Sequence, residues 1–176
     1  MSPQSGNSTP RRWLHLKRYI EIHETCTEHL LQYAIVRHDL VFEQVGLTII
    51  RLSGQVHCHG DLVLDVRKLL ERHQHDEMLG RSYSYQARFL SSSHRPDWKV
   101  FRYDNAHDNP PHFGHEDAYH KHVFDPYTGE EIGHPLHIGY ASWPTLSRVI
   151  LEMHEWWLHY HNDPFIYPDT ADSSKK

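Results

Sequence analysis

The sequence predicts a single α+β domain, in which a small antiparallel sheet of four to five strands carries a C-terminal helix on one face. Three observations lead to this prediction. Short apolar runs separated by glycine-containing turns indicate a β-meander in the first half. One later segment alternates between ring-bearing or apolar and polar residues, and the last long segment has apolar residues at helical spacing. A length of 176 residues, with 38% hydrophobic and 23% charged residues, suits one domain.

The two ends of the chain are rich in small and polar residues. Residues 1–10 and residues 169–176 are therefore predicted to be disordered, which leaves one domain over residues 11–168. Within it, Trp13 to Tyr33 is compatible with a helix, although His, Thr and β-branched residues weaken the pattern. This is the N-terminal helix of the predicted fold.

The first strands are predicted where apolar runs lie between turn residues. In chain order, the predicted elements are a strand at Leu47–Leu52, a turn at Ser53-Gly54, an extended segment at Gln55–His59, a turn at Gly60-Asp61 and a strand at Leu62–Val66. Periodicity leaves open whether Val66 to His73 ends a strand or forms a short helix.

The clearest strand pattern is at Tyr83 to Leu90. The residues predicted to share its buried face are Tyr83, Tyr85, Ala87 and Phe89. After a polar loop, Trp98 to Tyr103 reads as a second strand, so the two segments are predicted to form a hairpin. This hairpin brings Asp104 and Asn105 to its end.

The most regular helix pattern runs from Pro144 to about Tyr160. Proline suits the first turn of a helix, and Ser142 or Thr145 could cap it. The apolar residues at helical spacing are Leu146, Val149, Ile150, Met153, Trp157 and Tyr160.

Composition narrows the classes of function. The formal net charge is −5, with 18 basic and 23 acidic residues, which disfavours a general nucleic-acid coating protein. Two cysteines without a CxxC spacing fit a reducing compartment. No signal peptide and no apolar run near roughly 18 residues are visible, so the expected location is the cytoplasm, with no membrane partner.

Histidine is the unusual residue, with 19 in the chain. Several of them fall in the stretch from Tyr103 to His122. If Tyr119 to Phe124 is extended, His120 and His122 project to one face, and Lys121 points to the other. Two imidazoles are then neighbours.

Such a pair suggests cleavage of RNA without a metal. One neutral imidazole can remove the proton of a 2′-hydroxyl, and one charged imidazole can protonate the leaving 5′-oxygen. A cation stabilises the charge that develops on the phosphate, and a carboxylate such as Asp104 can orient a histidine. The predicted substrate-binding residues are Arg102, Lys121 and His107.

Two other interpretations of these histidines stay open. His120, His122 and Asp104 could instead bind a divalent transition metal such as Zn, Ni or Fe in a hydrolase, although no HExxH or cysteine cluster accompanies them. Alternatively, the stretch is a solvated histidine-rich loop on a non-catalytic protein-interaction domain.

The order of these motifs resembles the TumE family of toxin-antitoxin system toxins. The resemblance lies in a YDN motif, Tyr103, Asp104 and Asn105, followed by the pair His120 and His122 and by a final amphipathic helix. It implies a toxin with a cognate antitoxin protein as partner, and adds all three YDN residues to the candidate catalytic residues. RNA as the substrate is inferred from the residues. The sequence leaves a homodimer open.

The chain departs from shorter members of that family in two places. It has an N-terminal extension through about Leu40, and an insertion of about a dozen residues, 108–119, between the two motifs.

Overall fold

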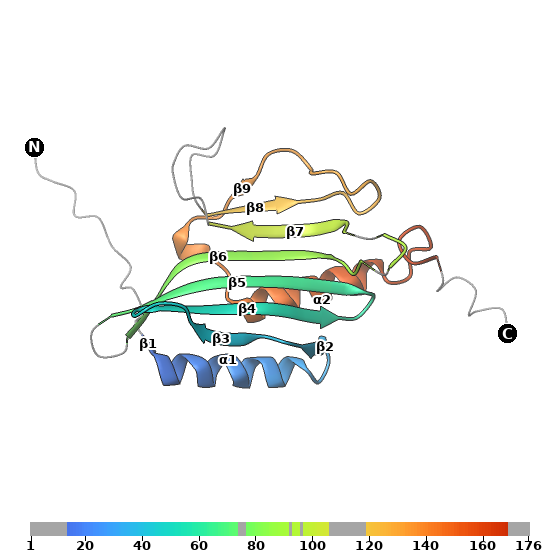
Figure 1. The fold of residues 1–176 in the computed structure, drawn as a ribbon. Helices are drawn as coiled ribbons and strands as arrows, with labels where there is room; N and C mark the ends of the chain where they lie inside the picture. Colours follow the sequence, from blue (N-terminus) through green and yellow to red (C-terminus); the bar gives the residue numbers. More distant parts are fainter. Residues whose placement is uncertain (1–13, 74–76, 92, 96, 106–118, 169–176) are drawn as a thin grey trace, which may run out of the picture.

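One antiparallel sheet organises the part of the chain that the computed structural model describes, which is residues 14–73, 77–91, 93–95, 97–105 and 119–168 (Figure 1). The strand order is β2-β4-β5-β6-β7-β8-β9, with β1 beside β6 and β3 beside β4. Helix α2 covers one face, as predicted, and α1 lies along the edge near β3. The α+β class is confirmed, but these residues form nine strands rather than four to five.

The elements have the following bounds in chain order: β1 Leu14–His15, α1 Leu16–Leu30, β2 Ile35–His38, β3 Val41–Gln44, β4 Ile49–Cys58, β5 Leu62–Arg72, β6 Glu77–Phe89, β7 Lys99–Asp104, β8 His120–Val123, β9 Leu136–His137, a short 3₁₀ helix Tyr140–Ser142, and α2 Leu146–Tyr160. The predicted disordered ends, residues 1–10 and 169–176, lie outside the described residues.

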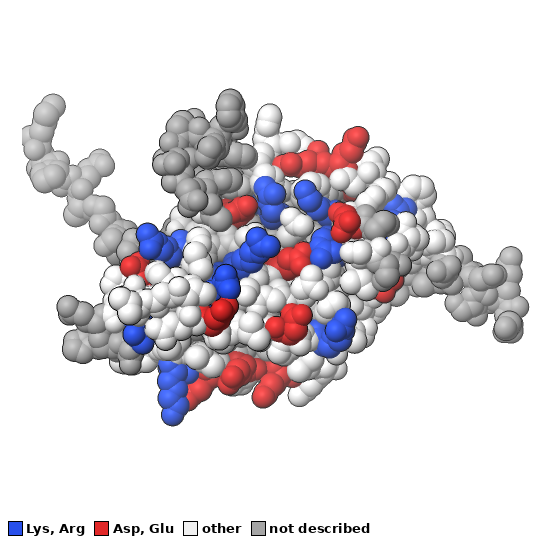
Figure 2. Space-filling model, in the orientation of Figure 1, with Lys and Arg blue, Asp and Glu red and all other residues white. Residues whose placement is uncertain are grey.

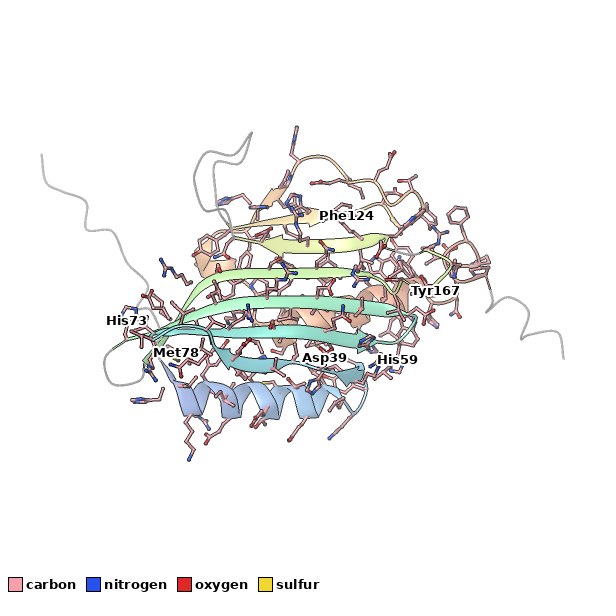
Figure 3. All side chains as sticks on the ribbon, viewed as in Figure 1. Asp39, His59, His73, Met78, Phe124 and Tyr167 are labelled. Atoms are coloured by element: carbon pink, nitrogen blue, oxygen red, sulfur yellow. The ribbon has the colours of Figure 1, made fainter. Side chains whose placement is uncertain are left out.

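The central strands are longer than the sequence suggested. The open question about Val66 to His73 is settled, because β5 continues to Arg72. The predicted turn at Ser53-Gly54 is wrong, since β4 runs through both residues. Glycine is needed at position 54 because the β2–β3 connection passes close to the β4 backbone there. A Cβ on Gly54 would lie 2.7 Å from the backbone oxygen of Asp39, which Figure 3 labels.

The core lies between the sheet and α2. Thr145 caps this helix by accepting a hydrogen bond from the Arg148 backbone N–H, and the helix ends at Tyr160 as predicted. Its buried residues Val149, Ile150 and Met153 pack against the sheet. The hairpin of β6 and β7 is also confirmed, with its two strands paired from Ser84–Asp104 to Arg88–Lys99.

Helix α1 packs on the same side of the sheet as α2, near the β3 edge. Tyr19 contacts a second apolar cluster that includes Met78, which Figure 3 labels at one end of the sheet. Between α1 and the sheet, the Lys68 amine lies 5.0 Å from the Tyr19 ring centroid and 4.7 Å from that of Tyr83. Burial lowers the pKa of Lys68 to about 8. Burial, followed by the charges of Lys68 and His38, lowers the pKa of His23 to about 4.

The other face of the sheet has no helix on it among the described residues, and we call it the open face (Figure 1). Along β4 to β8 its side chains are mostly polar, because strand residues alternate between the two faces. Figure 2 shows Lys and Arg side chains over the central strands of this face, interleaved with carboxylates.

Candidate active site

Strands β7 and β8 bring the two predicted motifs together. They pair in antiparallel register, with Arg102 opposite His122 and Asp104 opposite His120. Paired residues of neighbouring strands point to the same face, so these four side chains share the open face. The predicted orientation of the histidine pair is therefore confirmed, and the insertion 108–119 does not prevent the motifs from meeting.

The two imidazoles are in contact. Their ring centroids are 4.8 Å apart and their planes are inclined by 75°. Both residues are almost buried, with exposed fractions of 2% for His120 and 5% for His122. Buried histidines need specific polar partners, and those of His122 are well defined.

His122 lies between a carboxylate and a guanidinium. Its Nδ1 is 2.5 Å from Glu131 Oε1, and its Nε2 is 2.9 Å from Arg102 Nη2. A guanidinium can only donate, so Nε2 accepts that bond and Nδ1 carries the proton that it donates to Glu131. The arrangement holds His122 in one tautomer with its Nε2 lone pair directed at a cation.

A tight turn after β8 positions Glu131. The carboxylate of Asp125 accepts bonds from the backbone N–H groups of Tyr127 and Thr128, at 2.8 and 2.9 Å. Gly129, with φ of 73°, completes the reversal, and the returning chain forms a bridge between Phe124 and Glu131. The turn thus returns a carboxylate to the histidine that precedes it by nine residues.

Asp104, the carboxylate predicted to orient a histidine, lies on the open face next to the histidine pair. It lies opposite His120 in the register, and its Oδ2 is 3.6 Å from Arg102 Nε. Glu131 is the carboxylate on His122, and sequence reasoning missed it. The available signal was the strand-and-turn pattern after the histidine pair, which folds the chain back on itself.

Three other predicted site residues, Tyr103, Lys121 and Asn105, bond to neighbouring elements of the fold. Tyr103 donates a 2.7 Å hydrogen bond to Glu152 of α2, and the Lys121 ammonium is 2.5 Å from the other oxygen of that carboxylate. Burial, with the Glu152 bond and charge, raises the pKa of Tyr103. Asn105 Oδ1 accepts from the Tyr83 backbone N–H at 2.5 Å. The Tyr103 and Lys121 contacts join the β7–β8 pair to α2 on the face away from the histidines, and the Asn105 contact joins the end of β7 to β6.

His107 and the insertion 108–119 lie outside the described residues, except for Tyr119. The alternative metal set of His120, His122 and Asp104 is not recovered as a three-ligand group: among the described residues, no three His, Cys, Asp or Glu side chains are grouped to hold a metal ion. In the same part of the chain, no helix is long and apolar enough to span a membrane.

Comparison of the chain with protein-family models, with curated proteins and with solved structures finds no match.

Proposed function

We propose that this protein is the toxin of a toxin-antitoxin system and that it cleaves RNA with His120 and His122 as general acid and base. The supporting observation is the contact between the two imidazoles, 4.8 Å between centroids, with the Arg102 guanidinium at the edge of one of them. A base, an acid and a cation at a phosphodiester are the groups that RNA transesterification needs.

His122 is suited to act as the base. Its Nε2 already accepts a hydrogen bond, so it can accept the proton of a 2′-hydroxyl once Arg102 turns toward the phosphate. Glu131 then stabilises the imidazolium that forms, as a carboxylate on Nδ1 does in catalytic triads.

His120 completes the reaction as the acid. The 2′-oxygen forms its bond to phosphorus, the bond from phosphorus to the 5′-oxygen breaks, and the leaving oxygen takes the proton of His120. The products are a 2′,3′-cyclic phosphate and a 5′-hydroxyl. Arg102 carries the charge that develops on the phosphoryl oxygens. Because both rings are nearly buried in the free chain, RNA binding has to give the phosphate access to them.

The test is cleavage of a labelled single-stranded RNA by the purified full chain, with and without EDTA. We expect cleavage in both conditions, ending in a cyclic phosphate, and no cleavage of the matching DNA, which lacks the 2′-hydroxyl. The variants His120→Gln and His122→Gln should lose about 10²- to 10⁴-fold in rate. His29→Gln, an exposed histidine on α1, is the control and should keep full activity.

Because the histidine pair is buried, each variant also needs a thermal melt to show that it is folded. Folded histidine variants with wild-type cleavage would reject the proposal. Activity lost in EDTA and restored by a transition metal would favour the metal hydrolase instead.

The toxin role rests on the YDN motif and the histidine pair, and is tested separately in cells. Expression of the chain alone should slow growth, and the His122→Gln variant should not. A neighbouring reading frame whose product binds the chain and restores growth would be the cognate antitoxin. Unchanged growth at confirmed soluble expression would contradict this role.

A further inference from the structure

A groove lies on the open face over β4, β5 and β6, and β7 separates it from the histidine pair on β8. It has a volume of about 780 Å³ and is lined by side chains of β4, β5 and β6. Its charged residues are Arg51, Arg67 and Arg88, with Asp65 as the single carboxylate. We call it the arginine groove.

Two of the three arginines of this groove form ion pairs with carboxylates. Arg88 is held by Asp65 at 2.6 Å, and Arg51 by Glu43, outside the lining, at 2.5 Å. Arg67 is exposed and forms no ion pair within the described part of the chain. The lining therefore has a surplus of positive charge, although the whole chain is negative. An anionic ligand complements it.

The register of the sheet connects the groove to the histidines. Two rows of paired residues run across five strands on the open face. The first row is Ser53, Arg67, Ser84, Asp104 and His120; the second is Gln55, Asp65, Gln86, Arg102 and His122. With neighbouring strands about 4.8 Å apart, the rows extend for about 19 Å.

We propose that the arginine groove binds single-stranded RNA and leads the strand across β4, β5 and β6 to His120 and His122. This inference rests on the proposed RNA cleavage. Guanidinium groups bind phosphates, and the amide and hydroxyl groups of Gln55, Gln86 and Ser84 can hydrogen-bond to ribose.

Apart from the imidazoles of His120 and His122, the two rows contain no aromatic side chain, so bases have no ring to stack on over β4, β5 and β6. Binding through phosphate and ribose alone predicts an affinity that depends strongly on salt and weakly on base sequence.

The experiment measures binding by fluorescence anisotropy, with a labelled 2′-O-methyl oligouridylate that cannot be cleaved, over a series of salt concentrations. Loss of one phosphate contact should reduce the slope of log K against log salt by about 0.7, which is about fivefold in Kd at 0.1 M salt. We expect this change for Arg67→Gln, while Arg67→Lys, which keeps the charge, should retain the wild-type slope. Arg18→Gln on α1, whose side chain is 65% exposed, is the matched control and should bind as wild type.

The binding assay separates this inference from the proposed function. Weaker binding by Arg67→Gln supports the groove even if no RNA is cleaved, in which case the proposed function alone fails. Wild-type affinity and salt slope in Arg67→Gln, in a chain that does cleave RNA, would overturn the groove and leave the function intact. Binding of an acidic peptide in place of the oligonucleotide, lost in the same variant, would also overturn it.

Discussion

Two glutamates contact the β7–β8 pair from opposite faces, and the structure predicts different consequences for them. Glu131 bonds His122 on the open face, whereas Glu152 bonds Tyr103 and Lys121 on the helix face. Replacing each by glutamine keeps the shape and removes the charge. We expect Glu131→Gln to reduce activity, and Glu152→Gln to reduce stability.

The loss of activity follows from the charge on His122 in the transition state. The Glu131 side chain is 38% exposed, so its attraction to an imidazolium is partly screened by water. For unit charges about 4 Å apart, effective dielectric constants of 80 to 20 give about 1 to 4 kcal/mol, a factor of about 5 to 10³ in rate. We expect Glu131→Gln to slow the cleavage of RNA by a factor near the middle of this range, about 10²-fold.

The loss of stability follows from the lysine that Glu152→Gln leaves behind. The side chains of Lys121 and Glu152 are 19% and 23% exposed, between a surface pair and a buried one. Breaking such a pair should cost about 2 kcal/mol, or about 4 to 8 °C in Tm. Adding Lys121→Met to the variant should recover part of this loss, because no unpaired ammonium then remains.

The assays are the initial rate of RNA cleavage at saturating enzyme and a thermal melt, made on both variants. The expected result is a slow but stable Glu131→Gln chain and a less stable Glu152→Gln chain that retains its rate below its melting range. Equal rates for Glu131→Gln and wild type would refute the role of Glu131 on His122. A Tm shift below about 1 °C for Glu152→Gln would refute the energetic argument.

Further predictions concern stability. Burial lowers the pKa of Lys68 from 10.5 to about 8, so this residue loses its proton at a lower pH in the folded chain than in the unfolded chain. The free energy of unfolding should therefore rise by about 2 kcal/mol between pH 8 and 10. In urea titrations, Lys68→Met should remove this rise. The pKa of His23 is lowered from 6.5 to about 4, so the unfolded chain binds a proton more readily than the folded chain in this range. The free energy of unfolding should therefore fall as the pH falls from 6.5 to 4, and His23→Phe should reduce that fall. Gly54→Ala should lower the free energy of unfolding by about 2 to 3 kcal/mol, because the new Cβ would approach Asp39 and the φ of Gly54 is 142°. Gly133→Ala should lower it by only about 1 kcal/mol, because no atom lies within 4 Å of a Cβ at that position. Equal losses for the two variants would contradict the crowding argument.

Several features of this protein could be predicted because they depend on neighbouring residues along the chain. Alternation along a strand was enough to place His120 and His122 on one face and Lys121 on the other. The helical spacing after Pro144, with Thr145 as its cap, depends only on residues within a few positions. The same local patterns indicated the α+β class.

Local patterns also caused the errors. Glycine is common in turns, and Ser53-Gly54 was predicted as one, but at Gly54 the missing side chain makes room for Asp39. The four-residue strands β2 and β3 were missed because each is too short to show a period, and only pairing with β4 gives them extended structure.

Tertiary structure alone decided which groups meet. Glu131 reaches His122 through a turn, Glu152 reaches Tyr103 and Lys121 from another element, and Arg67 joins the row of His120 only through the register of five strands. Strand order and register follow from the burial of one face of the sheet against α2 and α1, because the apolar face of each strand must align with those of its neighbours. This burial energy depends on contacts between residues far apart in the sequence, so it cannot be read from any short segment.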